Sequence, residues 1–486
     1  MQQKPFYLTT TLPYVNADLH MGHALEFVRA DIVARYKQLV GFDVFFNTGT
    51  DEHGMKIYEK AVAGGLSPQA FVDQSFERFR ESVKIFGLDE RILHYARTTS
   101  PSHEAAAQEF WRRCDQNGYI YKKNYQAKYC VGCEEVKTDS DLVSGECPVH
   151  PGRALETIEE ENYFFKYSAF GEKLKELYAA RPDFVVPDFR FNEIKAFVER
   201  GLEDFSISRL KDKMPWGIPV PGDDKHVMYV WFDALTNYIS TLGWPDETSV
   251  SGGDFAKYWI GGTPTQYCGK DNLRFQSAMW QAMLMAAGVP NSHQIVINGF
   301  ITAEGGVKMS KTLGNVVDPK DIVAEYGTDA LRYFLASSIS NFEDSPFTAE
   351  RFKDVYNAKL ANGIGNLTSR IMKMATTHIP EAVVTPDKQV ELPMEYIEAF
   401  FAFNIQAAAA HIESRIVDMD QRIQKTEPFK LVKTDKDAAV AIIRDLVKEL
   451  YVVGKLLEPL VPETSAKIRE SVLAHAMPAP LFARKD

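Results

Sequence analysis

Hydrophobic residues occur in two different patterns along residues 1–114. Short β-branched and aromatic runs, "FYLTTT" and "DVFFNTGT", are typical of buried strands. Apolar residues recur at helical spacing in the stretch from His20 and again in "SPQAFVDQSFERFRESVKIFGL". Strands that alternate with helices predict a parallel sheet, in which ligands bind beyond the carboxyl ends of the strands. The turn at His20 and the "TGTDEHG" turn both follow strands, so we expect them to face one cavity.

The alternation of predicted strands and helices is interrupted once and then resumes, before helices alone follow. Residues 115–215 carry a cysteine-bearing loop and mixed segments, which predicts an insertion. Strands followed by helices come back over residues 216–318, in "HVMYVWFDALTNYIS", "PTQYCGKDNLRFQSAMWQAML" and "QIVINGF". Amphipathic helices dominate residues 319–486, and a helical bundle is the simplest assignment. The sequence therefore predicts an α/β body, interrupted once, with an all-α tail.

Composition and charge narrow the class of protein. The chain has 486 residues, 45% hydrophobic and 25% charged, which suits a folded enzyme with a sizeable core. No apolar run approaches the roughly 20 residues of a membrane span, and the N-terminus lacks a signal or transit pattern, so a cytoplasmic location is expected. The net charge of −11 argues against non-specific nucleic-acid binding, but a local basic face such as "RFKDVYNAKLANGIGNLTSRIMKMATTH" would suffice for RNA.

His20 and His23 flank a glycine where the first strand gives way to a helix. A helix N-terminus offers unpaired N–H groups and a partial positive charge, and both suit phosphate. The two imidazoles lie on one helix face and can donate to phosphate oxygens, while Gly22 leaves room for a base or ribose. Taken alone, such a pair more often only caps the helix or packs against it.

Cys130, Cys133, Cys147 and His150 form a metal-ligand pattern, C-x2-C and C-x2-H separated by thirteen residues. Each pair can hold one ion from a turn, and the four ligands together close a tetrahedral set, as in a structural zinc knuckle. Five cysteines in so long a chain do not make a disulfide framework. A zinc ion with no open position would serve folding and not catalysis. A knuckle that has lost its metal is the alternative.

A second phosphate candidate lies in "EGGVKMSKTLGN". Gly305 and Gly306 loosen a loop that carries Lys308, Ser310 and Lys311. Lysines on such a loop can close over a triphosphate and stabilise the charge on departing pyrophosphate. A solvated basic loop is the alternative for this segment on its own.

Together, HMGH after the first strand and KMSKT after the last resemble the HIGH and KMSKS signatures of class I aminoacyl-tRNA synthetases. Thr312 replaces the final serine and keeps the hydroxyl. Over nearly the full chain, "TTTLPYVNADLHMGH", "TGTDEHG", "YVWFDAL", "GKDNLRF" and "VKMSKT" follow the order of the methionyl-tRNA synthetase family, and the knuckle is similar to that family's zinc insertion. The resemblance implies a Rossmann-like catalytic domain with a zinc-knuckle insertion, followed by an all-α anticodon-binding bundle.

The resemblance also assigns catalytic and ATP-binding roles. Catalysis would fall to His20, His23, Lys308 and Lys311. ATP would be held by Gly22, Arg209, Gly269, Asp271, Lys308 and Lys311, with magnesium arriving on the nucleotide. An acidic residue suits ribose hydroxyls, although Asp271 could instead cap the helix that follows it.

A methionine side chain is long and polarisable, so it favours aromatic walls. Aromatic residues in or beside the motifs can supply these walls, although in apolar segments they more often belong to the core. The resemblance implies that the Leu12 amide and the Tyr238 hydroxyl address the sulfur and that Asp51 holds the ammonium. The full predicted methionine site is Leu12, Tyr14, Asp51, Trp231, Ala234, Leu235, Tyr238, Phe275, Gln276 and Trp280. The family usually has histidine at Gln276, which bears on the fine contacts to the side chain and not on the reaction.

In this family the helical bundle reads the anticodon. The segment "NLTSR" provides Asn366 and Arg370 one helical turn apart, on one face. Phe429, within "KTEPFKL", stands where the family most often has tryptophan, and a phenyl ring still stacks on a splayed-out base. An asparagine and an arginine on a solvated helix face are the alternative interpretation.

The predicted reaction is that of an ATP-dependent ligase. The methionine carboxylate attacks the α-phosphate of ATP, and the 3′-terminal ribose of a tRNA then takes the acyl group. The partners would be L-methionine, ATP and tRNA(Met), with the chain acting as a monomer. The alternatives are another class I synthetase such as the cysteinyl or leucyl enzyme, a non-catalytic tRNA-binding paralogue, and a small nucleotidyltransferase with the same HxGH turn.

Overall fold

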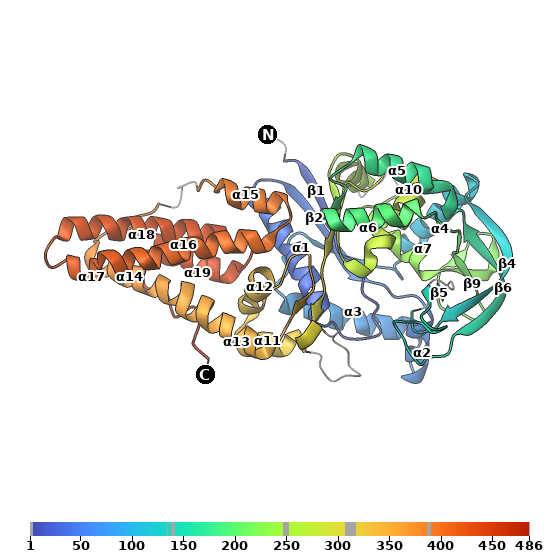
Figure 1. The fold of residues 1–486 in the computed structure, drawn as a ribbon, viewed down its shortest axis with the longest axis horizontal. Helices are drawn as coiled ribbons and strands as arrows, with labels where there is room; N and C mark the ends of the chain where they lie inside the picture. The colour runs from blue at the N-terminus through green and yellow to red at the C-terminus, as the bar shows by residue number, and fades with distance from the viewer. Residues whose placement is uncertain are drawn as a thin grey trace.

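The computed structural model describes residues 3–133, 135–137, 141–245, 252–306, 317–385 and 390–485. Figure 1 shows an α/β body on the right and a bundle of long helices on the left. Among the described helices, none combines the length and the apolar character needed to cross a membrane.

Six parallel strands form the central sheet of the body, in the order β3-β2-β1-β12-β13-β7. On one side of β1 the chain adds β2 and then β3. On the other side lie β12, then β13, and at the edge β7, which precedes both in the chain. Connections that leave a switch point in opposite directions open a crevice beyond the carboxyl ends of the strands. The predicted parallel sheet is confirmed. The strands are β1 (Pro5–Thr9), β2 (Asp43–Thr50), β3 (Leu93–Arg97), β7 (Val185–Val186), β12 (Pro264–Gly269) and β13 (Gln294–Asn298).

Helices cover both faces of this sheet. The helices of the body are α1 (Met21–Leu39), α2 (Met55–Ala63), α3 (Pro68–Ile85), α4 (Pro101–Gln116), α5 (Gly171–Ala180), α6 (Asp188–Glu199), α7 (Val230–Leu235), α8 (Asn237–Ser240), α9 (Gly252–Asp254) and α10 (Trp280–Ala287), with short η2 (Tyr167–Phe170), η3 (Phe255–Ile260), η4 (Lys270–Asn272), η5 (Phe275–Met279) and η6 (Glu304–Gly306). Phe6 and Leu8 of β1 join a core with α1 and α3, while Tyr7 joins a second core with α4 and α10. The alternation is the period of two that a strand imposes.

The segment between the halves of the body folds mainly as small sheets. An antiparallel sheet has the order β5-β4-β6-β8, and a second one has the order β10-β11-β9. Their strands are β4 (Ile120–Cys130), β5 (Glu135–Lys137), β6 (Glu156–Phe165), β8 (Phe205–Ser206), β9 (Ser208–Leu210), β10 (Pro219–Val220) and β11 (Asp223–Met228). The range 115–215 is not one separate unit, however, because β7 pairs with β13 at the edge of the central sheet. A strand of two residues carries no periodic signal that the sequence could have shown.

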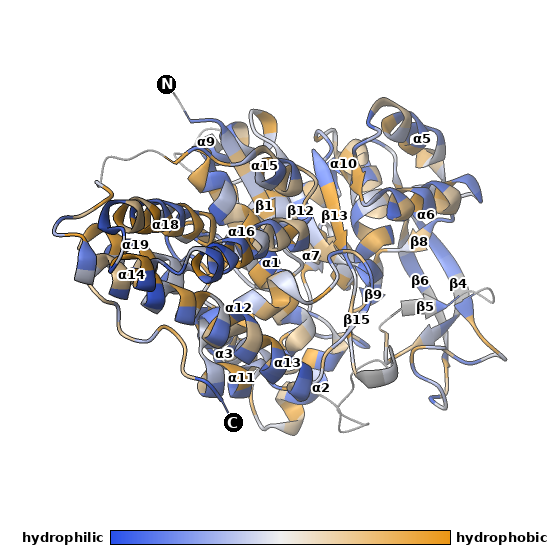
Figure 2. Cartoon of the chain, turned by 60° about the vertical axis from the view of Figure 1, so that its left-hand side comes forward, coloured by the Kyte–Doolittle hydropathy of each residue, from blue (hydrophilic) through white to orange (hydrophobic). Residues whose placement is uncertain are grey.

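The C-terminal part is helical, apart from β15 (Ser345–Pro346), which pairs with β14 (Ile301–Thr302). Figure 2 shows that its long helices carry both hydrophobic and hydrophilic residues, as amphipathic helices do when they pack together. The core of the bundle is continuous with the core on the α1 side of the sheet. The helices are α11 (Pro319–Tyr326), α12 (Thr328–Ser337), α13 (Ala349–Val355), η8 (Tyr356–Gly365), α14 (Asn366–His378), α15 (Met394–Phe401), α16 (Ile405–Thr426), α17 (Pro428–Leu431), α18 (Lys436–Leu456) and α19 (Pro462–Leu473).

Two fully buried arginines join the body to the helices that follow it. Arg29 of α1 donates to backbone carbonyls at the end of α12 and just beyond it, those of Leu335, Ile339, Ser340 and Asn341. Arg332 of α12 donates to Asp31 of α1 at 2.7 Å. It also donates to the carbonyls of Phe86, Gly87, Pro459 and Leu460. A buried guanidinium is tolerated only when its donors are used, so these contacts fix α1, α12 and the α18–α19 connection against one another.

Candidate active site

A cleft of about 440 Å³ opens at the switch point between β1 and β12. It is formed by the first turns of α1, by the ends of β12 and β13, and by the segments that follow these strands. The lining residues are Thr11, His20, Gly22, His23, Leu25, Glu26, Gly269, Asp271, Asn272, Asn298, Gly299, Phe300, Ile301, Thr302, Gly306 and Asp344. Five of the predicted catalytic and ATP-binding residues are thus brought together: His20, Gly22, His23, Gly269 and Asp271.

His20 and His23 form the N-terminal cap of α1. The His20 ring accepts from the Gly22 N–H at 3.1 Å, and the His23 ring accepts from the His20 N–H at 3.2 Å. This is a capping box in which imidazoles take the places of the usual serine and glutamate. The rings stack with centroids 3.9 Å apart. A methyl group added at Gly22 would lie 3.0 Å from the His20 ring, so the glycine keeps this cap open.

The caps also decide which ring nitrogens carry protons. In each histidine Nδ1 accepts a backbone hydrogen bond, and in a neutral ring this leaves the proton on Nε2. Burial, and then the neighbouring His20, lower the pKa of His23 well below its ordinary value, so His23 is neutral at pH 7. Each ring then has an Nε2–H that can donate to an anion in the cleft, and His23 does so without an added positive charge. The cap interpretation and the phosphate interpretation of the sequence are compatible.

Glu26 is a cleft residue that sequence reasoning missed. Its carboxylate accepts from the Thr11 N–H at 2.8 Å, from the Thr11 hydroxyl at 2.6 Å and from the Gly269 N–H at 3.1 Å. These bonds tie the segment after β1 to the end of β12, across the switch point. Burial raises the pKa of Glu26 to about 7 in spite of the hydrogen bonds, and Asp271 adds to the rise. The only sequence signal was a glutamate on the buried face of a helix.

The lysine loop follows directly on the cleft. Gly306 lines it, and Lys308 and Lys311 come just after Gly306 in the chain. Residues 307–316 lie outside the described residues, so the predicted roles of Lys308 and Lys311 stay predictions.

The segment after β1 and the turn after β2 meet beside the cleft. Tyr14 and Asp51 form a parallel β-bridge, with the Asp51 N–H donating to the Pro13 carbonyl at 3.0 Å. Leu12 lies in the same segment and is partly exposed. Three residues of the predicted methionine site, Leu12, Tyr14 and Asp51, are therefore held by one short backbone pairing.

The remaining predicted methionine residues gather where α7 and α8 meet η5 and α10. The Trp231 and Phe275 rings stack 4.1 Å apart, at an interplanar angle of 7°. Ala234 and Leu235 are buried on the same helix as Trp231. Trp280 is fully buried and packs its edge against Tyr238, with the ring centroids 5.8 Å apart. Trp280 thus supports Tyr238 from the core.

Gln276 fixes the hydroxyl of Tyr238. Its amide donates to that oxygen at 2.6 Å and accepts from the Gln266 amide at 2.8 Å, and both glutamines are buried. Because the Tyr238 oxygen accepts this bond, its own proton is left for another acceptor. The departure from histidine at this position therefore preserves a tyrosine O–H donor.

Arg209 is not among the residues that line the cleft. It lies on β9, 6% exposed, with its guanidinium 4.5 Å from the Tyr229 ring centroid and 5.4 Å from that of Tyr129. Nη1 donates to the Ser208 carbonyl and the Ser206 hydroxyl. The predicted contact of Arg209 with the triphosphate stays a prediction.

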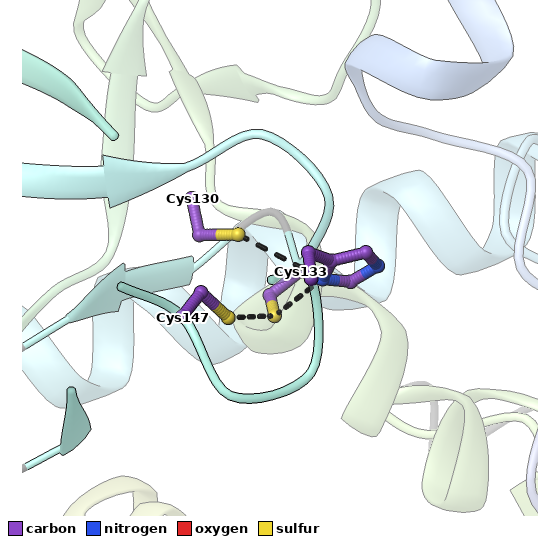
Figure 3. A group of neighbouring side chains, drawn as sticks. Cys130, Cys133 and Cys147 are labelled. Atoms are coloured by element: carbon purple, nitrogen blue, oxygen red, sulfur yellow. Dashed lines mark hydrogen bonds between the residues drawn. The ribbon is translucent and has the colours of Figure 1, made fainter. Parts of the chain in front are cut away.

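The four predicted metal ligands converge between the end of β4 and the start of β6. Figure 3 shows the three cysteines of this group turned toward one another. All four ligand atoms lie within 4.8 Å of one another. The Sγ atoms of Cys133 and Cys147 are 3.5 Å apart, and His150 Nδ1 lies 3.3 Å from Cys133 Sγ and 3.8 Å from Cys130 Sγ. A tetrahedral zinc with thiolate bonds of 2.3 Å has ligand edges of about 3.8 Å, so the donor set fits this ion. A side chain at Gly132 would begin 2.6 Å from the His150 ring, which explains the glycine between the first two cysteines.

The bundle brings two of the three predicted anticodon residues to one hollow of about 540 Å³. It is lined by Ser369, Arg370, Lys373, Met374, Ile423, Phe429 and Met477. Phe429 is 45% exposed, and Arg370 is half-buried and paired with Asp420 of α16. Asn366 is exposed one turn before Arg370 on α14, outside this lining.

Comparison with known proteins gives the site its family. A family model described as class I tRNA synthetases (M) matches residues 6–157 and 151–372, and one described as the anticodon binding domain of methionyl tRNA ligase matches residues 381–481. With this match, the parallel sheet and the histidine-capped cleft define a class I aminoacyl-tRNA synthetase. Methionine–tRNA ligases of Caldanaerobacter subterraneus and Thermosynechococcus vestitus are each 38% identical, covering 97% and 95% of this chain and 74% and 89% of theirs. The chain belongs to the methionyl-tRNA synthetase family and is an aminoacyl-tRNA ligase.

Solved structures agree with this assignment. Methionyl-tRNA synthetase of Mycobacterium tuberculosis in complex with methionyl-adenylate is 33% identical over the full length of both chains, with a TM-score of 0.88. The apo form of that enzyme is 31% identical, with a TM-score of 0.82, and covers 100% of this chain and 99% of the other.

Proposed function

We propose that the chain activates L-methionine with ATP in the cleft and transfers the methionyl group to the 3′ end of tRNA(Met). The cleft at the switch point, with two imidazole donors and Glu26 at its wall, is the observation that carries this proposal. In such a reaction the protein positions two substrates and stabilises the departing pyrophosphate, so it needs no covalent nucleophile.

ATP would bind with its phosphates toward His20 and His23. The Nε2–H groups, held at the positive end of the α1 dipole, are preorganised for anionic oxygens, which favours the charge that develops on pyrophosphate. Gly269 and Asp271 would take the ribose. Lys308 and Lys311 would bind the triphosphate, and magnesium would arrive with the nucleotide.

Methionine would lie between Asp51 and the aromatic group around Tyr238. Asp51 would hold the ammonium, and Trp231 and Phe275 would give the thioether an apolar wall. Because Gln276 donates to the Tyr238 oxygen, the Tyr238 O–H can itself donate to the thioether sulfur, which is a weak acceptor. A pocket that discriminates only by size separates side chains differing by one methylene by about 1 to 3 kcal/mol, so this polar contact would add to the selectivity.

The metal cluster would hold one zinc ion with a structural role. Cys130, Cys133, Cys147 and His150 fill all four positions, and the bound ion would fix the tip of the insertion. The bundle would read the anticodon through Asn366, Arg370 and the exposed ring of Phe429. We further propose that the chain works as a monomer in the cytoplasm.

Amino-acid-dependent exchange of labelled pyrophosphate into ATP tests this function. The wild type is assayed with each of the twenty amino acids and no tRNA, beside Lys308→Ala and a matched surface control, Lys448→Ala, on the far bundle. We expect exchange with methionine alone, greatly reduced in Lys308→Ala and unchanged in the control. Exchange with a different amino acid would overturn the pocket assignment, and no exchange from folded protein would favour a non-catalytic tRNA-binding paralogue.

A further inference from the structure

A chain of buried polar residues lies behind the proposed methionine site, and none of the roles above uses it. Asp233 of α7 meets His53 Nδ1 through Oδ2 at 2.7 Å and His103 Nε2 through Oδ1 at 2.8 Å. The other nitrogen of His103 lies 2.9 Å from the Ser240 hydroxyl. The four side chains are at most 8% exposed. Well-packed apolar residues often match a buried ion pair in stability, so stability alone does not account for this arrangement.

Three of these four hydrogen-bonded residues lie on elements that carry proposed methionine contacts. His53 follows Asp51 by two residues in the turn after β2. Asp233 lies on α7 between Trp231 and Ala234, and Ser240 ends the short helix α8 that carries Tyr238. His103 comes from the first turn of α4, which provides no proposed substrate contact and serves as a fixed point behind the site.

The turn that carries Asp51 is also fixed on its other sides. The Glu52 carboxylate, fully buried, accepts from Arg97 at 2.8 Å and from the hydroxyls of Thr50 and Thr99. The Trp216 indole donates to the Glu52 carbonyl at 2.6 Å. With these contacts in place, the bond between His53 and Asp233 links the turn directly to α7.

Charge strengthens this link. Burial alone would lower the pKa of His53, but the Asp233 carboxylate outweighs it and the pKa of His53 is raised, with Glu104 and Glu52 acting in the same direction. Burial alone would raise the pKa of Asp233, but His53 and His103 together hold it below its ordinary value. The pair therefore favours an ionised aspartate facing a protonated His53.

We propose that the chain His53–Asp233–His103 is a positioning device that sets the distance between the ammonium site at Asp51 and the side-chain pocket on α7 and α8. Because this distance must match the length of the bound amino acid, the three residues determine specificity for methionine over shorter and longer side chains. The proposal rests on the proposed roles of Asp51, Trp231 and Tyr238. Its physical basis is that a small displacement of one substrate-holding group relative to another weakens productive binding out of proportion to its size.

Asp233→Asn tests the proposal, because it keeps the shape of the side chain and removes its charge. We expect the KM for methionine in pyrophosphate exchange to rise about ten- to a hundredfold, with the KM for ATP changed less than about twofold. The preference for methionine over the shorter norvaline and the longer ethionine should fall. Asp223→Asn is the matched control, because Asp223 pairs with the buried His226 at 3.0 Å on β11, away from the pocket. It should change thermal stability and leave the KM for methionine and the preference unchanged.

Two results would overturn the proposal: an unchanged KM for methionine in folded Asp233→Asn, or equal rises in the KM for methionine and for ATP. If that variant does not fold, His53→Gln replaces it, because a glutamine amide can still donate to Asp233. In His53→Gln the KM for methionine should again rise more than the KM for ATP, but by a smaller factor. If it does not, the result also counts against the proposal. A wild type without methionine-dependent exchange would instead overturn the proposed function, and this inference with it.

Discussion

The body and the bundle place their polar side chains in opposite ways. Around the sheet, charged groups are buried and fully used: Glu26 ties β1 to β12, Glu52 and Asp233 hold the turn after β2, and Arg29 and Arg332 are 0% exposed. On the far bundle, ion pairs such as Arg422 with Asp445 lie at the surface, with about half of each side chain exposed. The one aromatic ring predicted to stack on a base, Phe429, is 45% exposed.

This difference follows from the sizes of the proposed ligands. Methionine and ATP can be enclosed, and hydrogen bonds aimed at them are strongest where water is excluded and the donors are fixed in advance. A tRNA anticodon is too large to enclose, so its bases must come to side chains that already stand at the surface. Substitutions in the body should therefore lower stability or activity far more than similar substitutions in the bundle.

The largest effect is expected for a buried arginine. Arg332→Met should lower the free energy of unfolding by about 3 to 5 kcal/mol, because Asp31 and four carbonyl groups lose a donor inside the core. Urea denaturation of the variant and the wild type measures this. A loss below about 1 kcal/mol would mean that water reaches this site and that the contrast between body and bundle is wrong.

The second-largest effect is expected when one donor to the phosphates is removed. His23→Ala should reduce the rate of pyrophosphate exchange about 100- to 1000-fold, the cost of one preorganised donor to developing charge. His378→Ala, at the end of α14 in the bundle, serves as the control and should leave exchange unchanged. Full exchange in folded His23→Ala would show that His23 only caps α1.

The sequence predicted the residues that lie close together in the chain or on recurring motifs. Four strands of the sheet (β1, β2, β12 and β13), the His20 turn and the metal ligands each follow from a short segment whose pattern is visible by itself. Glu26 and Asp233 could not be assigned in this way, because their partners come from elsewhere: Gly269 is 243 residues from Glu26, and His53 is 180 residues from Asp233. A charged residue on a buried helix face shows that a partner must exist, but only the fold identifies it.

Glu26 gives a pH-dependent prediction. Its pKa is raised from 4.5 to about 7, so its contribution to stability is complete below pH 4.5 and is lost as the pH rises through 7. At about 1.4 kcal/mol for each tenfold change in proton affinity, the loss is about 3 kcal/mol at most. The free energy of unfolding of the wild type relative to Glu26→Gln should therefore fall between pH 5 and pH 8. Parallel pH curves for the two proteins would contradict a raised pKa.

On the bundle, Arg370→Ala should act on tRNA alone. Aminoacylation of tRNA(Met) should lose about 1 to 3 kcal/mol, or roughly ten- to a hundredfold in kcat/KM, while pyrophosphate exchange without tRNA stays at the wild-type rate. Arg444→Ala is a matched control, because Arg444 is paired with Glu381 on the same bundle, away from the hollow at Phe429. Equal losses in both variants would indicate a general charge effect instead of a base contact.

The smallest effect is expected for a surface pair of the bundle. Arg422 and Asp445 are 3.1 Å apart, but solvent screens the pair and each side chain loses freedom by pairing. A double-mutant cycle of Arg422→Ala and Asp445→Ala should give a coupling of about 0.5 kcal/mol or less, measured by urea denaturation. Arg332 and Asp31, 2.7 Å apart, make the same kind of bond with both side chains fully buried, where solvent does not screen it. A surface coupling above about 1 kcal/mol would place both pairs in one class and remove the contrast between body and bundle.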